Sequence, residues 1–300
     1  MKRTILQLMG IFLLSGTVFA AGDPGDVLQV SVGARASALG RSVTGIVTDS
    51  TAVFWNPAGL GSTDKWDVAA TGYHYLEWDY QAASLAGNWQ GIGFGVGYLG
   101  TSLQGVQEST VGINGRGSDT GNSFGETQSV WLAGASIQLP FMEKTRFGVT
   151  AKELSHQLRT FSASGFGMDI GIQGEVEDWG GVRWGIQGVN ILRPTLTWNT
   201  PSKSVETAEM VIRPGISIPF FNKTLWVNTQ IEFQAKTSEL QVGTEYWVMP
   251  MVALRGGYAQ KHLSLGTGLI MSGFLVDFSW EGSSLDSVAD AYKFSLGYRW

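Results

Sequence analysis

The sequence predicts an all-β fold, namely a transmembrane antiparallel β-barrel of about fourteen strands with an N-terminal hatch segment in its lumen. Three observations support this prediction. Apolar and polar residues alternate strictly over many short runs, the composition is poor in charge, and long and short connections sort onto opposite ends of the strands. The first residues do not alternate. We therefore expect a signal peptide (1–20), a hatch (21–62) and a barrel (63–300).

The clearest alternation lies at the end of the sequence. Every second residue from Tyr292 to Trp300 is aromatic or apolar, and Lys, Ser, Gly and Arg stand between them. A helix would spread these residues around its circumference, whereas a strand sorts them onto two faces. One oily and one polar face is the pattern of a strand between lipid and a wet lumen. A last strand ending on an aromatic residue, here Trp300, resembles the signal by which Gram-negative cells insert outer-membrane barrels, so the barrel-insertion machinery is an expected partner.

Runs of this kind occur about fourteen times along the sequence. Each is about ten residues long, which is the length that a tilted strand needs to cross a membrane. The strands are expected to begin near residues 66, 80, 91, 126, 146, 165, 183, 209, 224, 239, 251, 262, 273 and 290. If the first strand runs outward, the long connections all fall at the outer end, at 100–125, 156–164, 193–208 and 282–289. Long outer loops and short inner turns are typical of a membrane barrel.

Composition favours a membrane barrel over a secreted β-sandwich or propeller, which would also alternate. Only 15% of the residues are charged, and the chain holds 41 glycines and 12 tryptophans. Soluble domains carry about a quarter charged residues, many of them Lys and Glu on the exposed face. The pI near 5.3 and the lack of a basic cluster exclude nucleic acid as a partner. We expect the outer membrane of a Gram-negative-type bacterium, with membrane lipid and lipopolysaccharide as partners.

The N-terminus indicates export. Lys2 and Arg3 precede an apolar run over 5–14, and Val18-Phe-Ala20 places small residues at the spacing that signal peptidase uses. The run is too short to span a bilayer as a helix. The alternative is a buried N-terminal helix. The sequence has no cysteine, so we expect neither a disulfide framework nor a lipid-attachment site.

Residue patterns for catalysis are lacking in the sequence. His74, His156 and His262 lie in distant segments without the spacing of metal ligands. Ser155 and His156 adjoin, but neighbours in a strand point to opposite faces and cannot form a dyad. We predict no catalytic residues, no metal site, no cofactor and no enzymatic activity.

The non-alternating segment 21–62 combines small residues with a few large apolar anchors and a turn at Asn56-Pro57. Its motifs are Arg35-Ala-Ser-Ala-Leu-Gly40, an aspartate at position 49, and Trp55-Asn-Pro-Ala-Gly-Leu60. This combination resembles the PorV/PorQ branch of the FadL-type outer-membrane proteins. The resemblance covers the hatch motif, the strand count and the end of the chain. By motif it carries over to Arg35, Gly40, Asp49, Trp55, Asn56, Pro57, Ala58 and Gly59. The alternative is a periplasmic extension without a role in gating.

The resemblance implies a fourteen-stranded barrel closed by an N-terminal hatch. A PorV/PorQ-like chain would be a component of type IX-like secretion that binds or carries exported cargo through its outer loops, chiefly 100–125 and 193–208. The short chain and plain loops favour this hypothesis. A FadL-like chain would instead pass long-chain fatty acids or other hydrophobic compounds, with the hatch as gate and a lateral exit at a kink in strand three. A third hypothesis is a structural barrel without transport.

Strand three carries a stripe of glycines. Gly91, Gly93, Gly95 and Gly97 alternate with Ile92, Phe94, Val96 and Tyr98. Such a stripe on the lumen side leaves room for the hatch and weakens the strand enough to bend. The stripe therefore indicates either close packing of the hatch or a lateral opening.

Charged residues fall on the faces assigned to the lumen. They are Lys152, Asp169, Glu175, Arg213, Glu232, Glu239, Glu245, Arg255 and Asp277. A Lys or Arg facing lipid at mid-depth costs about 2–4 kcal/mol, so charges belong inside. A three-residue turn over 249–251 would place Glu245 opposite Arg255. We predict that these two residues form a cross-strand salt bridge with a structural role.

Overall fold

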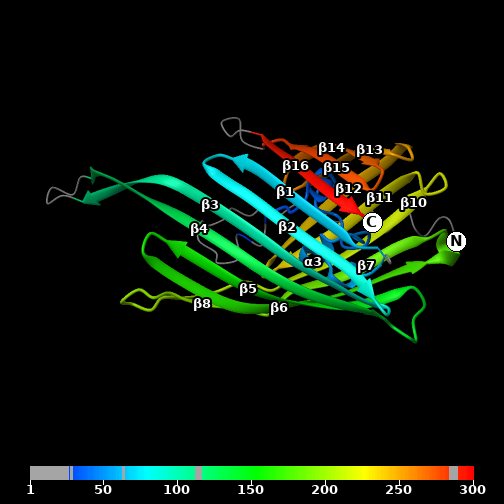
Figure 1. Cartoon of the computed structure of the whole chain (residues 1–300), viewed down its shortest axis with the longest axis horizontal. Helices are drawn as coiled ribbons and strands as arrows, with labels where there is room; N and C mark the ends of the chain where they lie inside the picture. Colours follow the sequence, from blue (N-terminus) through cyan, green and yellow to red (C-terminus); the bar gives the residue numbers. More distant parts are fainter. Residues whose placement is uncertain (1–26, 28–29, 63–64, 112–116, 284–289) are drawn as a thin grey trace.

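The computed structural model describes residues 27, 30–62, 65–111, 117–283 and 290–300. The expected signal peptide lies outside the described residues. Over the described chain, fourteen antiparallel strands form a closed barrel, and a separate two-stranded sheet lies beside it (Figure 1). The predicted fold class and the strand number are confirmed.

Each barrel strand pairs with the next barrel strand along the chain, β7 with β10, and the wall closes where β16 meets β1. The barrel strands are β1 (Asp67–Tyr75), β2 (Trp78–Trp89), β3 (Ile92–Val111), β4 (Gly117–Gln138), β5 (Thr145–Leu158), β6 (Phe161–Val176), β7 (Val182–Leu192), β10 (Val211–Phe220), β11 (Leu225–Gln234), β12 (Thr237–Met249), β13 (Val252–Ala259), β14 (His262–Met271), β15 (Phe274–Glu281) and β16 (Ala291–Arg299). The remaining pair, β8 (Thr195–Thr197) and β9 (Val205–Thr207), forms the small sheet. A 3-10 turn, η2 (Glu177–Trp179), connects β6 to β7.

The prediction of a loop over 100–125 is wrong. β3 continues to Val111 and β4 already begins at Gly117, so the two strands form a long hairpin that reaches beyond the other strands at the left of Figure 1. The register shifts between Leu103 and Val106 and again between Gln107 and Ser109. These irregularities and the polar residues on both faces remove the alternation that would have predicted the strands.

Two other predicted outer loops differ from the structure. Over 156–164, only Arg159 and Thr160 lie between β5 and β6, and Arg159 adopts a left-handed φ of 56° in this tight turn. The connection 193–208 contains the β8–β9 hairpin, whose tip lies against β6, since the Asn199 N–H donates to the Ser162 carbonyl at 3.0 Å. Most of 282–289 lies outside the described residues.

The two faces of the wall differ in chemistry. Large apolar side chains point outward and are exposed, as at Val96 (51%), Leu254 (51%) and Phe294 (60%). Polar side chains such as Asn228 and Gln241 point inward and are fully buried. A continuous apolar outer surface of this kind suits hydrocarbon rather than water. Among the described residues, no helix has the length and the apolar character needed to cross a membrane.

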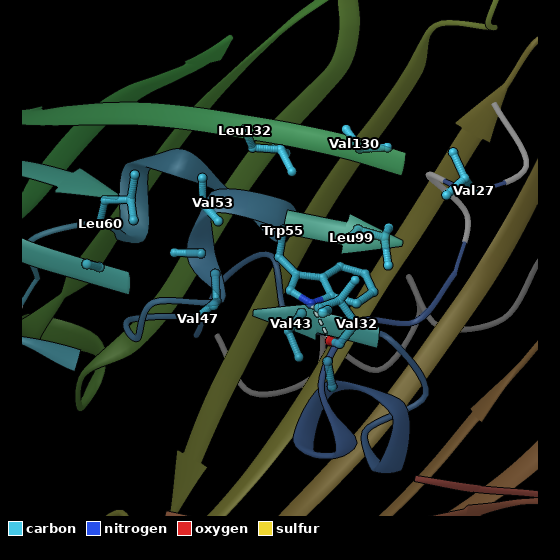
Figure 2. Close-up of a cluster of buried hydrophobic side chains, with 14 of the residues drawn as sticks. Val27, Val32, Val43, Val47, Val53, Trp55, Leu60, Leu99, Val130 and Leu132 are labelled. Carbon is cyan, nitrogen blue, oxygen red and sulfur yellow. Dashed lines mark hydrogen bonds between the residues drawn. The ribbon is translucent and has the colours of Figure 1, made fainter. Parts of the chain in front are cut away.

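The hatch, described at residue 27 and over 30–62, lies inside the barrel (Figure 1). It contains two short helices, α2 (Ala34–Ala38) and α3 (Ala52–Trp55), and a 3-10 turn, η1 (Pro57–Gly59). Its apolar side chains pack with side chains of the wall in one cluster (Figure 2). Labelled members are Val43, Val47, Val53, Trp55 and Leu60 from the hatch and Leu99, Val130 and Leu132 from β3 and β4. The N-terminal segment therefore fills the lumen that the closed wall creates.

Candidate functional site

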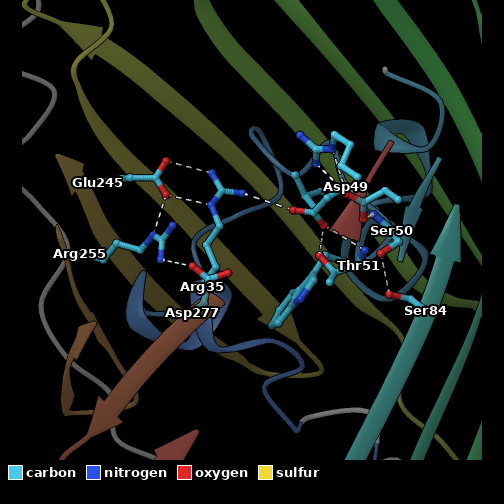
Figure 3. Close-up of polar contacts among 12 residues, drawn as sticks. Arg35, Asp49, Ser50, Thr51, Ser84, Glu245, Arg255 and Asp277 are labelled. Atoms are coloured by element: carbon cyan, nitrogen blue, oxygen red, sulfur yellow. Dashed lines mark hydrogen bonds and ion pairs between the residues drawn. The ribbon is translucent and has the colours of Figure 1, made fainter. Parts of the chain in front are cut away.

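An ion cluster links the hatch to the wall (Figure 3). Arg35 of α2 donates to both carboxylate oxygens of Glu245 on β12, at 2.8 and 3.1 Å. Glu245 also accepts from Arg255 at 2.8 Å, and Arg255 pairs with Asp277 of β15 at 2.6 Å. We call these four residues the latch. Since Glu245 and Arg255 are only 3% exposed, the low local dielectric strengthens their attraction.

The predicted opposition of Glu245 and Arg255 corresponds to the observed register, in which they are direct cross-strand partners. Sequence reasoning missed the third and fourth members. It assigned Asp277 to the lumen and Arg35 to the hatch motif, but it did not connect them. Pairing within the wall follows from register, whereas no register relates position 35 to position 245. The predicted lumen residues include six carboxylates but only three basic side chains, and this excess is the signal that could have indicated a further arginine.

Gly40 and Asp49 follow Arg35 in the hatch and position its backbone. The Asp49 carboxylate lies 3.7 Å from Arg35 and accepts the N–H of Thr51 at 3.0 Å, which fixes the start of α3. Gly40 has a left-handed φ of 56°, and a Cβ there would lie 2.6 Å from the backbone nitrogen of Tyr258. Only glycine permits both the conformation and the close approach to β13.

The Trp55-Asn-Pro-Ala-Gly segment forms the buried end of the hatch. Trp55 donates its indole N–H to the Val32 carbonyl at 2.9 Å (Figure 2). Asn56 is fully buried and donates to the carbonyls of Thr44, at 2.8 Å, and Ile172, at 3.2 Å. The side-chain carbonyl oxygen of Asn56 accepts the N–H of Ala58 at 3.2 Å and so caps η1. One asparagine thus joins two parts of the hatch to β6.

Pro57, Ala58 and Gly59 are buried. The wall leaves room for them because it has glycines, without side chains, where it faces them. A Cβ at Gly148 of β5 would overlap the backbone of Pro57 and Ala58. A Cβ at Gly59 itself would overlap the carbonyl of Val47. The motif therefore rests on β5 and β6 of the wall, and the residues that follow it reach β3.

The glycine stripe of β3 receives the end of the hatch. A Cβ at Gly93 would overlap the Leu60 carbonyl, and one at Gly95 would lie 2.7 Å from the Leu60 side chain. At Gly97 it would lie 2.8 Å from Phe54. Gly91 lies in the turn before β3 with φ of 83°, and a Cβ there would have no atom within 4 Å. In this structure the stripe is a seat for the hatch.

An interior pocket lies between the hatch and the wall. Its lining is mostly apolar, from Val30, Val32, Phe54 and Trp55 of the hatch and Leu99, Val130, Leu132 and Val189 of the wall. Its volume is about 20 Å³. That volume accommodates about one water molecule. The pocket is therefore small, and its lining is mostly apolar.

The basic residues of this pocket are paired with carboxylates. Lys152 donates to Asp169 at 2.6 Å, and Arg213 donates to Glu232 at 2.6 Å. All four side chains are at most 6% exposed. The Arg213 guanidinium also lies 5.9 Å from the Trp55 ring, a cation–π distance. The pocket consequently carries charged groups but no net charge from these pairs.

In the part of the chain that the structure describes, no group of three or more His, Cys, Asp or Glu side chains could hold a metal ion. His156, which adjoins Ser155, contacts Glu126 at 2.8 Å and stacks edge-on against Trp198. In the described part of the chain, His156 therefore pairs with Glu126 and packs against Trp198.

Comparison with known proteins supports the fold through structure. No family model and no curated protein sequence matches the chain. Among solved structures, the toluene transporter TbuX of Ralstonia pickettii is similar with a TM-score of 0.63 and 16% identity, over 90% of this chain and 98% of that one. The deltaS2S3 mutant of the TodX monoaromatic hydrocarbon channel gives 0.65 and 15%, over 90% and 98%. A FadL homologue of Pseudomonas aeruginosa gives 0.58 and 11%, over 95% and 99%. The fold is that of the FadL-type barrels.

The latch predicts that Glu245→Gln releases the hatch. Two guanidinium groups would then face a neutral amide in a buried site, and removing one partner of a buried ion pair costs about 3–5 kcal/mol. The chain has no cysteine, so Ser50→Cys, at a fully buried hatch position, provides a single reporter. Its labelling by a water-soluble maleimide should accelerate by roughly 100-fold or more, since each 1.4 kcal/mol is a factor of ten.

The matched control is Glu209→Gln. This carboxylate pairs with Arg193 at 3.1 Å, but both side chains are more than 40% exposed. Exposed pairs contribute about 0–1 kcal/mol, so labelling should stay within a few-fold of the parent. Equal labelling rates in the two variants would contradict the role assigned to the latch.

The glycine seat predicts that Gly93→Ala lifts the end of the hatch, because its methyl group would occupy the place of the Leu60 carbonyl. Trypsin should then cleave after Arg41, which is only 5% exposed in the seated hatch. The peptide is quantified by mass spectrometry. The control is Gly256→Ala, whose methyl group meets its nearest atoms at an ordinary 3.7 Å. If Gly93→Ala leaves Arg41 as resistant as Gly256→Ala does, the seat is not needed.

Proposed function

We propose that this chain is an outer-membrane channel for uncharged hydrophobic compounds, with the hatch as its gate. The observation that carries the proposal is the small, mostly apolar pocket between the hatch and β3, β4 and β7. Pockets for apolar ligands are lined mainly by hydrophobic and aromatic side chains with few polar groups. The similarity of the fold to barrels described as toluene transporters and a monoaromatic hydrocarbon channel supports the same function.

Charge pairing in the pocket favours a neutral ligand over a fatty acid. A carboxylate that enters an apolar site needs a free cation, because desolvating an unpaired charge costs several kcal/mol. Lys152 and Arg213 are already bound to Asp169 and Glu232. A neutral aromatic or aliphatic molecule would leave both pairs intact.

Passage requires the hatch to move. The volume of the pocket is about 20 Å³. A cavity that binds benzene measures about 150 Å³. Val30, Val32, Phe54 and Trp55 form the hatch side of the pocket, so displacement of these residues would enlarge it. We assign the closed state to this structure, with the latch as the restraint on opening.

The apolar outer wall supports placement in the outer membrane, with lipid and lipopolysaccharide around it. Polar groups inside and apolar groups outside are the reverse of a soluble barrel. The wall would be assembled by the barrel-insertion machinery, for which the strand ending at Trp300 provides the expected signal. Nothing in the proposed function requires an enzymatic step.

A second candidate is the PorV/PorQ-like export component, which binds exported proteins at the surface. One observation favours it. Beyond the pairs Leu103↔Trp78 and Glu126↔Leu158, β3 and β4 pair only with each other. Both edges of this ribbon can accept another strand. Two of the solved structures reported above are described as a monoaromatic hydrocarbon channel and a toluene transporter, and they favour the channel over the export component.

One experiment tests both candidates. Cells that lack or express the chain are compared for uptake of radiolabelled toluene and of benzoate, its charged analogue, and for the proteins on their surface. The channel predicts toluene uptake at least tenfold above that of cells without the chain, unchanged benzoate uptake and unchanged surface proteins. A loss of surface proteins without any change in toluene uptake would favour the export component and overturn the channel.

A further inference from the structure

Arg41 of the hatch is a buried arginine without a direct partner. Among the described residues, five basic side chains are buried, and they are Arg41, Lys152, Arg213, Arg255 and Lys293. Each of the other four donates to a carboxylate at 2.6 to 3.0 Å. For Arg41, which is only 5% exposed, the described chain provides no ion pair, and its Nε has no hydrogen-bond partner. Burying a charged group without hydrogen bonds is unfavourable, so this arginine is an exception that needs a physical reason.

The backbone conformation at Arg41 gives no such reason. Its φ is 64°, in the left-handed region that favours glycine, and it follows Gly40, whose φ is 56°. The N–H of Arg41 donates to the Ala36 carbonyl at 2.9 Å, which closes the turn after α2. A glycine or an asparagine would adopt this conformation at a lower cost in free energy than an arginine does. The reason for an arginine at this position therefore lies in what its side chain can bind.

The groups around the Arg41 guanidinium belong to one end of the barrel. Four residues lie within electrostatic range of it, namely Tyr73, Glu232, Glu239 and Glu281. Each of the four lies within two positions of the end of its strand, and in every case this is the end remote from Trp300. If the first strand runs outward, this is the outer end of the lumen. Arg41 therefore lies on the side of the hatch that a compound from outside would meet first.

The three carboxylates near Arg41 accept hydrogen bonds from other groups. In the order just given, the donors are Arg213 at 2.6 Å, the backbone N–H of Gln260 at 2.6 Å and Lys293 at 3.0 Å. Three basic side chains, Arg41, Arg213 and Lys293, thus balance three carboxylates, and the region has no net charge from these residues. A guanidinium has five N–H donors and no acceptor. What Arg41 lacks is therefore acceptors for its hydrogen bonds rather than negative charge nearby.

From these contacts we propose that Arg41 binds the oxygen atom of an uncharged ligand, a phenol or another aromatic compound with one oxygen acceptor. The inference rests on the proposed channel function and names a class of ligand within it. A neutral oxygen accepts from the guanidinium and leaves the balance of charge unchanged. A carboxylate ligand would instead add a fourth negative charge close to the three carboxylates, and like charges repel.

The oxygen site is close to the interior pocket. Glu232, which lies within electrostatic range of Arg41, is bound to Arg213, and Arg213 lines the pocket. One ion pair therefore separates the Arg41 guanidinium from the pocket lining. Arg41 is also part of the hatch, so a ligand that binds it contacts the gate itself. The ligand would be recognised by its oxygen at the gate before its apolar part enters the pocket.

Binding in lipid nanodiscs tests the oxygen site. Equilibrium dialysis against empty nanodiscs gives the affinity of the protein for radiolabelled p-cresol, an uncharged phenol, and for radiolabelled toluene. In Arg41→Met the affinity for p-cresol should fall roughly 10- to 100-fold, the effect of a hydrogen bond from a charged donor, while that for toluene stays within about twofold. The matched control is Arg193→Met, because this arginine is exposed and pairs with Glu209. Both affinities of the control should equal those of the parent.

Thermal unfolding separates ligand binding from a structural role. Arg41→Met exchanges an unsatisfied buried charge for an unbranched apolar side chain, so the unfolding midpoint of the unliganded variant should lie above that of the parent. Added p-cresol should raise the midpoint of the parent but not that of Arg41→Met, because a ligand stabilises only the state that binds it. A structural role predicts a lower midpoint in the variant and equal losses of affinity for p-cresol and toluene. That result would overturn the inference.

The charged analogue p-toluate tests the ligand class, and uptake tests the channel separately. The parent should bind p-toluate more weakly than p-cresol, and equal or tighter binding would overturn the assignment to uncharged ligands. If the ratio of the p-cresol and toluene affinities is the same in Arg41→Met as in the parent, the oxygen site fails, whatever the uptake. If cells expressing the parent take up no more toluene than empty cells, the channel function fails, and the dialysis alone decides whether Arg41 binds the oxygen of p-cresol.

Discussion

The bidentate pair between Arg35 of the hatch and Glu245 of the wall is the interaction on which the closed structure depends. It joins two parts of the chain that are 210 residues apart. Glu245 is shared with Arg255, and Arg255 with Asp277, so Arg35 joins a chain of ion pairs that extends over β12, β13 and β15 of the wall. Breaking the contact would remove one of the two guanidinium partners of the buried Glu245, which opposes opening. The surrounding apolar cluster and the glycine seats position the hatch, and the latch retains it.

The same constraint explains why the polar groups of the lumen are already paired, which in the proposed channel would disfavour charged ligands. A wall whose outer face is apolar must direct its ionisable groups inward, where each needs a partner. The hatch supplies some of these partners, and the pairs Lys152–Asp169 and Arg213–Glu232 supply others. Once these pairs have formed, the remaining free surface of the interior pocket is apolar. An arrangement required for stability therefore also favours neutral hydrophobic ligands.

The sequence predicted those parts of the fold that follow from a period of two. Thirteen of the strands begin within a few residues of their expected starts, and the pair Glu245–Arg255 follows from register alone. Prediction was wrong where both faces of a strand are polar, as in the hairpin that ends β3 and begins β4. It was also wrong at the turn near Arg159, where a left-handed conformation occurs without glycine. The contacts of the hatch could not be predicted, because a segment without periodicity has no register to its surroundings. The residue at which the pairing of β1 with β16 ends could not be predicted either, since it depends on how the first and last strands meet.

The central claim is that the hatch is a structured plug that leaves its seat when an apolar ligand enters. Hydrogen exchange of the protein in lipid nanodiscs, followed by mass spectrometry of peptides from 30–62, tests it most directly. Without ligand, we predict protection of the hatch amides close to that of the barrel strands. Saturation with toluene should reduce protection over 30–34 and around Trp55, while the strands remain protected. Hatch amides that exchange as fast as an unfolded chain before any ligand is added, or that stay fully protected in its presence, would contradict this account.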